Sequence, residues 1–251
     1  MAEAAVAVAV IGARGRMGGE VCRAVDGAAG LALVGRYDVG DDLGDLGGAA
    51  VAVDFSVPDA SPGNVAHCVE RGVHAVVGTT GWSEERLSAL RRQLDSAPEV
   101  GVLVAPNFAL GAVLMMAFAE RAARFYESVE IVELHHPDKV DAPSGTAART
   151  AGLIGAARDA AGLAPLPDAT TSDPHGARGG RVHGIPVHSV RLRGLVAHQE
   201  VLLGNPGEML TIRHDSFDRV SFMPGVLAAV RAVGSHPGLT VGLEHYLGLS
   251  D

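Results

Sequence analysis

The sequence predicts an α/β protein, in which a doubly wound parallel sheet is followed by a second, α+β domain with a mixed sheet. Three observations predict this fold class. Short apolar runs alternate with helical patterns up to residue 106. A glycine-rich turn follows the first apolar run directly. From residue 186 on, the pattern changes to successive short strands separated by turns.

The first part of the chain has the pattern of strands that are buried on both faces. We expect strands at residues 6–11, 31–37, 50–56, 74–78 and 101–106. Helices are expected between them at residues 17–25, 64–72 and 83–94, the last with Ser83 as its N-cap. Near-continuous apolar strands that alternate with helices are typical of a parallel sheet covered on both sides.

The second part of the chain no longer alternates in this way. A long helix is expected at 108–126, a strand at 129–136, a helix from about Ser144 to Arg158, and a loop rich in Gly, Pro and Asp over 162–184. Consecutive antiparallel strands are expected at 186–194, 198–204 and 208–215, and a final helix at 222–233 that packs on the first helix. The expected domains are residues 1–107 with 217–251 for a dinucleotide, and 108–216 for substrate and oligomerisation.

Composition and charge restrict the class of function. The 251 residues suffice for one large or two modest domains, and 47% of them are apolar, as in globular proteins. A net charge of −9 argues against a general nucleic-acid binder, although a local cationic pocket is compatible with it. Two cysteines are too few for a disulfide framework or a thiol metal site. Without a basic leader or a membrane-length apolar stretch, we expect a cytoplasmic protein with no membrane partner.

The turn GARGRMG at residues 12–18 predicts a dinucleotide site. Its spacing is G-x-x-G-x-x-G, where G-x-G-x-x-G is commoner, but the physical reasons for the glycines are the same. Gly12 permits the tight turn, Gly15 lets a pyrophosphate approach the backbone, and Gly18 allows close packing of helix on strand. Arg14 and Arg16 add positive charge. The alternative is an ordinary turn, which the flanking strand and helix make less attractive.

Three further segments belong to the same expected site. Asp38 ends the second strand, where dinucleotide domains place the acid that binds the adenine ribose, although it could also be an ordinary acid of the loop DVGDDLGD. GTTG at 78–81 and APNF at 105–108 follow later strands. Ligands bind at the carboxyl ends of parallel strands, so their hydroxyl, amide and backbone groups can serve a nicotinamide and its ribose.

The segment HHPDKVDAPSGTA at 135–147 predicts an anion site in the second domain. Pro143 is expected in the first turn of a helix. Ser144, Gly145 and Thr146 then present N–H groups and hydroxyls at the positive end of that helix, and two histidines and Lys139 come just before it. A small acid with more than one carboxylate suits this set. Adjacent histidines with Asp138 could also bind a metal, but neighbouring strand residues point to opposite faces, so we expect no metal. The hydroxyls could also serve simple helix capping, and the histidines could be structural residues.

Several of these motifs together resemble those of one known family. ELHHPDKVDAPSGTA resembles a motif of the dihydrodipicolinate reductase family, and GARGRMG, VVGTTG, APNFALGAV and GLVAHQEVLLG match the same family in the same order over nearly the whole chain. The resemblance implies an N-terminal Rossmann-like domain that binds NADH or NADPH. It also implies a second domain that binds substrate and forms a homotetramer through its sheet, and a C-terminal segment that returns to the first domain.

The resemblance also implies roles for individual residues. His135 corresponds to the acid/base histidine and Lys139 to the proton donor. Substrate-binding positions are His136, Ser144, Gly145 and Thr146. Cofactor-binding positions are Gly12, Ala13, Arg14, Gly15, Arg16, Met17, Asp38, Gly78, Thr79, Thr80, Ala105, Pro106, Asn107 and Phe108. Val39 stands where some members carry an arginine suited to the 2′-phosphate of NADPH, which leaves the cofactor preference open.

The implied activity is NAD(P)H-dependent reduction of 4-hydroxy-tetrahydrodipicolinate, a cyclic dicarboxylate, in the diaminopimelate and lysine pathway. Hydride transfer to the ring is followed by protonation, which agrees with a cofactor domain joined to an anion-binding domain. Two rival functions stay open. One is another NAD(P)-dependent reductase on the same plan, such as an amino-acid dehydrogenase, and the second is a cofactor-sensing protein without catalysis.

Overall fold

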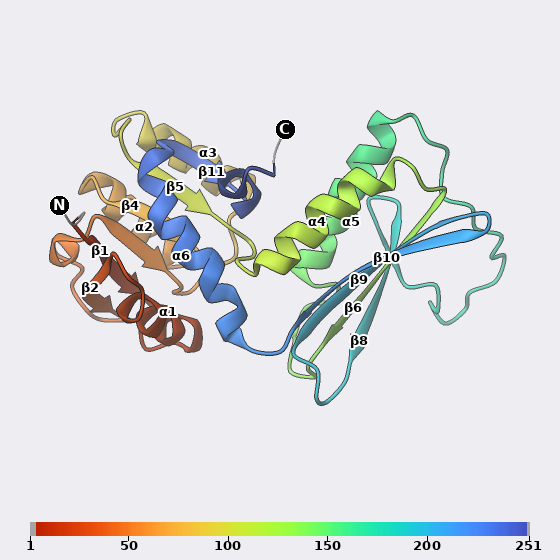
Figure 1. The fold of residues 1–251 in the computed structure, drawn as a ribbon, viewed down its shortest axis with the longest axis horizontal. Helices are drawn as coiled ribbons and strands as arrows, with labels where there is room; N and C mark the ends of the chain where they lie inside the picture. Colours follow the sequence, from red (N-terminus) through yellow and green to blue (C-terminus); the bar gives the residue numbers. More distant parts are fainter. Residues whose placement is uncertain (1–3, 250–251) are drawn as a thin grey trace. The chain divides into compact units, whose positions relative to one another are not determined.

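A computed structural model of the chain describes residues 4–249. These residues divide into two compact units. The first unit contains the chain up to Ala109 and from Arg219 on, and the second contains Leu110–Asp218. Figure 1 labels the helices and strands of each unit. The two fold types expected from the sequence, a parallel doubly wound sheet and a mixed sheet, are both confirmed.

The first unit is built on a six-stranded parallel sheet in the order β11-β5-β4-β3-β1-β2. Its strands are β1 (Val6–Ile11), β2 (Leu31–Tyr37), β3 (Val51–Asp54), β4 (His74–Val77), β5 (Gly101–Val104) and β11 (Gly238–Val241). The direction in which strands are added reverses between β1 and β3. In sheets of this kind, the crevice for a ligand opens at that reversal, beyond the carboxyl ends of the strands.

Strand β11 corrects the expectation that the parallel series ends with the fifth strand. It pairs in parallel with β5, from Gly238 beside Gly101 to Val241 beside Val104. The sequence pattern does not reveal it because it has only four residues, all of intermediate burial, at the edge of the sheet. It also comes more than a hundred residues after β5, its partner strand, so no local alternation of strand and helix predicts it.

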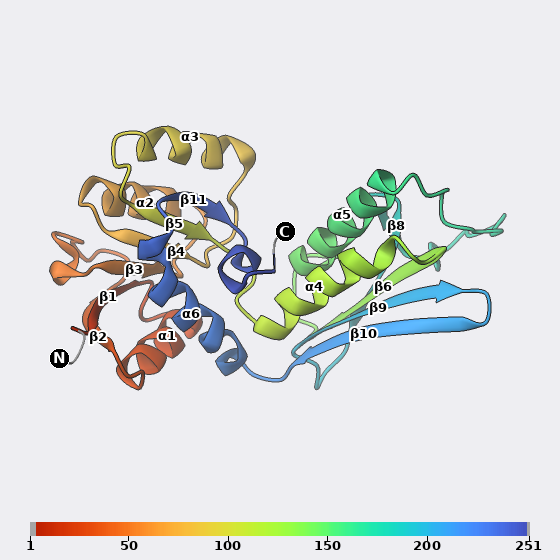
Figure 2. The ribbon, with the colours of Figure 1, turned by 45° about the horizontal axis from the view of Figure 1, so that its top comes forward.

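Helices cover both faces of this sheet, as Figure 2 shows. They are α1 (Arg16–Asp26), α2 (Ser61–Glu70), α3 (Glu84–Leu94) and α6 (Met223–Ala232). Helices α2 and α3 pack with strand residues in one buried cluster. Helix α6 contacts α1, so the expected return of the last helix onto the first is confirmed. Ser83 is the N-cap of α3 and accepts the backbone N–H of Arg86, also as expected.

The glycine turn and helix α1 are in direct backbone contact. Gly12 has a φ of +81°, and a Cβ there would lie 2.4 Å from the backbone oxygen of Phe55. A Cβ on Gly18 would lie 2.1 Å from the backbone oxygen of Gly12. Gly15 is the N-cap of α1. The turn can therefore sit this close to the sheet and to the helix only because side chains are absent at these positions.

The second unit has a mixed sheet in the order β10-β9-β6-β8-β7. Its strands are β6 (Ser128–His135), β7 (Gly180–Val182), β8 (Ile185–Arg191), β9 (Ala197–Asn205) and β10 (Glu208–Ser216). Only β6 and β8 run parallel to each other. Helices α4 (Leu110–Ala123) and α5 (Gly145–Ala160) contact each other and share one buried apolar cluster with the sheet.

The strand order corrects the expectation of three consecutive antiparallel neighbours. Strands β9 and β10 form the expected hairpin, but β6 lies between β8 and β9. The physical reason is burial: along β6 every second residue from Val129 to Glu133 is buried, so this strand takes the centre of the sheet. Strand β7, with three residues, lies within the segment expected to be a loop.

The contact between α1 and the glycine turn gives a prediction with a matched control. Gly18→Ala should lower the free energy of unfolding by about 2–3 kcal/mol, because the added methyl meets a backbone oxygen that cannot move aside. Gly19→Ala, one position along the same helix, should raise it by about 0.5–1 kcal/mol, because a Cβ there has no neighbour closer than 3.8 Å. Urea unfolding of both variants measures the difference. Equal effects of the two substitutions would contradict this account of the turn.

Candidate cofactor and substrate sites

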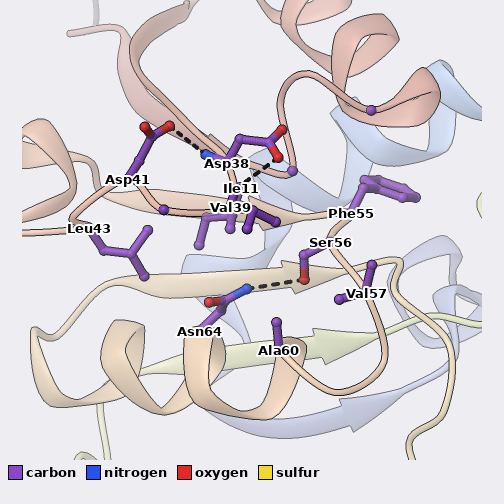
Figure 3. Close-up of a pocket in the computed structure, with 13 residues that line it drawn as sticks. Ile11, Asp38, Val39, Asp41, Leu43, Phe55, Ser56, Val57, Ala60 and Asn64 are labelled. Atoms are coloured by element: carbon purple, nitrogen blue, oxygen red, sulfur yellow. Dashed lines mark hydrogen bonds between the residues drawn. The ribbon is translucent and has the colours of Figure 1, made fainter.

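A pocket of about 400 Å³ lies at the strand reversal of the first unit (Figure 3). It is lined by residues that follow three neighbouring strands, β1, β2 and β3, and by the start of α2. These residues are Ile11, Gly12, Gly15, Asp38, Val39, Gly40, Asp41, Leu43, Phe55, Ser56, Val57, Ala60 and Asn64. Three expected cofactor positions, Gly12, Gly15 and Asp38, are therefore brought together here.

The carboxylate of Asp38 is fixed at the pocket by the glycine turn. Its Oδ2 accepts the backbone N–H of Arg14 at 2.7 Å, and its Oδ1 accepts the N–H of Val39 at 2.9 Å. These two hydrogen bonds lower the pKa of the Asp38 carboxyl below its usual value, and the one from Val39 has the larger effect. The group is consequently ionised at neutral pH and can accept hydrogen bonds from sugar hydroxyls.

Asp41 is a second acid at the same place, and no sequence motif indicates it. Its Oδ2 accepts the backbone N–H of Asp38 at 2.8 Å, and it forms an ion pair with Arg14 at 3.0 Å. Arg36, a further arginine at this end of the sheet, pairs instead with Asp26 at 2.8 Å. Two guanidinium groups that could meet a 2′-phosphate are thus already engaged by carboxylates.

The loops after β4 and β5 lie at the same edge of the sheet but outside the pocket lining. Phe55 lines the pocket and also packs against both loops. A Cβ on Gly78, after β4, would lie 2.1 Å from the Phe55 ring, and the centroids of the Phe55 and Phe108 rings are 5.7 Å apart. Thr79 is buried, and its hydroxyl donates to the backbone oxygen of Asp54. The structure does not place Ala13, Arg14, Arg16, Met17, Gly78, Thr79, Thr80, Ala105, Pro106, Asn107 or Phe108 in the pocket lining, so their cofactor roles stay predictions.

The segment after β3 also belongs to the pocket, although the sequence motifs did not include it. Phe55, Ser56 and Val57 line the pocket, and Ser56 accepts a hydrogen bond from the side chain of Asn64 at 3.1 Å. A signal was available, because the residues after the strand next to β1 lie at the point where the strand order reverses. Their side chains form no recognisable motif, and only the topology identifies them.

In the second unit, the start of α5 lies beside the end of β6. Ser144 is the N-cap of α5, and its buried hydroxyl accepts the backbone N–H of Ala147 at 3.2 Å. Gly145 and Thr146 begin the helix, and a Cβ on Gly145 would meet nothing within 4 Å. Pro143 precedes the cap and is not in the first turn, which corrects the expectation for that residue. The open helix start offers N–H groups to an anion.

The residue that organises this region is Glu133, which sequence reasoning missed. Its side chain is fully buried, and its carboxylate accepts two hydrogen bonds from Arg191, at 2.8 and 2.9 Å. It also accepts the backbone N–H of Ser144 at 3.3 Å and forms a short hydrogen bond with Nδ1 of His135. Burial raises the pKa of Glu133, but the hydrogen bonds from Arg191, Ser189 and His135 outweigh it and leave the pKa lowered.

Lys139 joins this region through Asp141. Its ammonium forms an ion pair with the Asp141 carboxylate at 2.7 Å, and Arg191 donates to the backbone oxygen of Asp141 at 2.7 Å. His135, Lys139 and Ser144 thus belong to one connected network centred on Glu133 and Arg191. His136 follows His135 at the end of β6, and its backbone oxygen accepts the N–H of Lys139 at 3.3 Å.

Two properties of the described residues bear on metal binding and on membranes. Among residues 4–249, no group of three or more His, Cys, Asp or Glu side chains is placed to hold a metal ion. No helix in that range combines the length and the apolar character needed to cross a bilayer.

The fold defines the class: an oxidoreductase with a dinucleotide-binding unit of Rossmann type and a second unit built on a mixed sheet. Solved structures of low identity share the fold alone, among them an amine dehydrogenase from Mycobacterium smegmatis (17% identity, TM-score 0.60, 94% of each chain covered). Residues 6–108 match the family model "Dihydrodipicolinate reductase, N-terminus", and residues 111–247 match "Dihydrodipicolinate reductase, C-terminus". The chain belongs to the dihydrodipicolinate reductase family.

Individual relatives agree with the family models. The chain is 61% identical to the 4-hydroxy-tetrahydrodipicolinate reductase of Streptomyces griseus, over 97% of this chain and 98% of the relative. It is 62% identical to the protein of the same name from Cutibacterium acnes, over 97% and 99% of the two chains. A dipicolinate-bound dihydrodipicolinate reductase from Paenisporosarcina sp. TG-14 superimposes with a TM-score of 0.85 at 36% identity, covering 96% of this chain and 99% of that one.

Proposed function

We propose that this enzyme reduces 4-hydroxy-tetrahydrodipicolinate to tetrahydrodipicolinate with NADH or NADPH, as a step of diaminopimelate and lysine biosynthesis. One observation carries the proposal: a chain of this family holds His135 and Lys139 in a single network beside the open start of α5. The relative from Paenisporosarcina, with its bound dipicolinate, supports a cyclic dicarboxylate as the ligand class.

The chemical difference between substrate and product determines what the site must supply. The product carries a hydrogen where the substrate carries the 4-hydroxyl group. The balance is one hydride and one proton, with the hydroxyl leaving as water. A nicotinamide supplies the hydride when bound, and the protein supplies the proton. The lysine ammonium of Lys139 and the imidazole of His135 are the groups placed to provide or pass on that proton.

The first unit fits a nicotinamide dinucleotide. A side chain at Gly12 or Gly18 would occupy the space in which the turn approaches the backbone, and the ionised Asp38 carboxylate lines the same pocket. Asp38 would bind the adenine ribose, and the start of α1 with Gly15 as its cap would face the pyrophosphate. The loops at 78–80 and 105–108 would bind the nicotinamide half.

The second unit would hold the dicarboxylate. The N–H groups of Gly145 and Thr146 at the start of α5 suit one carboxylate, because they lie at the positive end of a sixteen-residue helix. His136 and Lys139 add a hydrogen-bond donor and a positive charge. We propose that Ser144 positions this carboxylate site, because its hydroxyl caps the helix that presents these groups.

Removing the two proton-handling groups should slow turnover without affecting the cofactor. General acid assistance is typically worth about 10²–10⁴-fold, so Lys139→Ala and His135→Ala should each lower kcat within that range. Thr146→Val should mainly raise KM, because it removes binding present in the ground and transition states alike. Steady-state kinetics and NADH titration measure both effects. Nearly full kcat in Lys139→Ala at saturating substrate would show that this lysine only binds a carboxylate.

Both cofactors should be used, with less than about a hundredfold difference, roughly 3 kcal/mol. Asp38 and Asp41 repel a 2′-phosphate, whereas Arg14 attracts it once released from Asp41. Asp41→Asn should therefore raise kcat/KM for NADPH by about three- to tenfold and leave that for NADH nearly unchanged. Asp42→Asn is the control, because Asp42 lies in the same loop but does not line the pocket. An equal response of both cofactors would refute the role of Asp41.

The enzyme should be a homotetramer assembled through the strands between about 186 and 215. Strand β10 is an edge of the sheet, and its residues Met209 and Leu210 are 69% and 37% exposed. An exposed edge strand with apolar side chains tends to pair or to be covered. Light scattering at working concentration should report four chains of 25.7 kDa each. A stable monomer would contradict this proposal.

We also place the enzyme in the cytoplasm. Cys22 and Cys68 are both buried and free, and burial raises the pKa of the Cys68 thiol to about 12. Two unbridged thiols agree with a reducing compartment.

A further inference from the structure

We propose that Glu133 is the positioning residue for His135: it holds the ring through Nδ1, so that Nε2 is the nitrogen that exchanges a proton during the reaction. The inference rests on the proposed function, in which His135 is an acid/base group. It adds a residue that touches neither substrate nor cofactor and acts through the imidazole. Three features carry it, namely the position of the carboxylate, the tautomer it requires, and the charges around the ring.

The carboxylate of Glu133 is held by partners on both of its oxygens. It has no exposed side-chain surface, and Arg191 donates to both of its oxygens. Arg191 is itself fixed, because it also donates to the backbone oxygens of Val190 and Asp141, at 2.9 and 2.7 Å. The backbone N–H of Ser144 is a third donor to the same carboxylate. The acceptor for His135 is thus anchored to β6, to β8 and to the start of α5 at once.

An ionised carboxylate can only accept hydrogen bonds, and this determines the tautomer of His135. The hydrogen bonds from Arg191 favour the ionised form of Glu133, and its pKa is lowered in spite of burial. Because Nδ1 of His135 faces this carboxylate, Nδ1 must carry a proton. In the neutral ring, Nε2 is then left as the acceptor. The same arrangement sets the reactive nitrogen in other enzymes that pair a histidine with a buried carboxylate.

The charges around His135 oppose one another, which makes the contribution of Glu133 measurable. Burial is the largest influence and lowers the pKa of His135, the Glu133 carboxylate raises it, and Lys139 and Arg191 lower it. Further titratable groups near this end of β6 are Asp141, which pairs with Lys139, then His136 and Asp138 in the same segment, and His198 beside Leu134 on β9. The net shift is downward, so the resting ring is neutral at pH 7. Neutralising Glu133 removes the main raising influence and must lower this pKa further.

The same strand provides a matched control. Glu130 also accepts from an arginine, Arg178, and from a histidine, His188, whose Nε2 lies 2.7 Å from its Oε2. Glu130 is 31% exposed at its side chain, and, three residues from Glu133 on a strand, it faces the opposite side of the sheet. Replacing Glu130 changes an Arg–Glu–His group of the same composition without touching His135.

The experiment compares the pH dependence of kcat in Glu133→Gln, Glu133→Asp, Glu130→Gln and His135→Asn with that of the parent enzyme. His135→Asn identifies the limb of the profile that belongs to His135, because that limb should disappear. In Glu133→Gln we expect kcat to fall about 10- to 100-fold with little change in KM. We also expect the His135 limb to move to lower pH by about one unit, since an opposite charge has been removed from beside the ring. Glu130→Gln should leave kcat and the limb unchanged, with light scattering confirming that its assembly is intact.

Glu133→Asp covers the case in which the buried amide prevents folding. It keeps a charge for Arg191 but withdraws the carboxylate from Nδ1 by one methylene. We expect a smaller loss of kcat and a shift of the limb in the same direction. If kcat falls while the limb stays in place in every soluble Glu133 variant, Glu133 is only a structural group and the inference is wrong. If His135→Asn keeps its kcat and its limb, the proposed role of His135 fails instead, which is a separate outcome.

Discussion

The second unit depends on one carboxylate that is completely removed from water. A buried charge is tolerated only when partners compensate it, and breaking such a set by removing one member typically costs about 3–5 kcal/mol. For Glu133 the compensation comes from Arg191 on β8, from the backbone of Ser144 at the start of α5, and from His135 on its own strand. Helix start, sheet and imidazole are therefore fixed relative to one another by a single group. This rigidity supports the acid/base role that we propose for His135.

The first unit achieves close approach in a different way, through missing side chains instead of buried charge. Backbone atoms of Phe55 and Gly12 fill the positions that side chains at Gly12 and Gly18 would need. The turn can then bring the N–H of Arg14 onto Asp38. The pocket that results carries two carboxylates, Asp38 and Asp41. Its electrostatics favour hydroxyl groups, and Arg14, which pairs with Asp41, is the cation that we propose would meet a 2′-phosphate.

Local patterns in the sequence were sufficient for most of the fold. Strands β1 to β5 are largely apolar, and α-helices separate all of them except β2 and β3, a pattern typical of a parallel sheet covered on both faces. Two features depended on pairing between distant segments and were not predictable in this way. Strand β11 joins β5 from the far end of the chain, and β6 inserts between β8 and β9. A period of two identifies a strand but does not say which strand lies beside it.

The candidate sites show the same division. Gly12, Gly15 and Asp38 belong to a motif, and the structure places them together in one pocket. Glu133 is the first residue of the segment ELHHPDKVDAPSGTA, but the sequence assigned it no role, because an acid on an alternating strand has the same local pattern whether it faces water or the core. Its burial follows only from the position of α5 and Arg191. Asp41 was likewise hidden in an acidic loop, where its contact with Arg14 depends on the fold of the turn.

The central claim is that this chain moves a hydride from a nicotinamide to the ring of a cyclic dicarboxylate. The most direct measurement uses NADH deuterated at the transferred position and 4-hydroxy-tetrahydrodipicolinate generated in situ, with mass spectrometry of the product. The account predicts one equivalent of NADH oxidised for each tetrahydrodipicolinate formed, with the deuterium on the product ring. Substrate-dependent oxidation that leaves the ring unlabelled, or no oxidation of either NADH or NADPH, would contradict it.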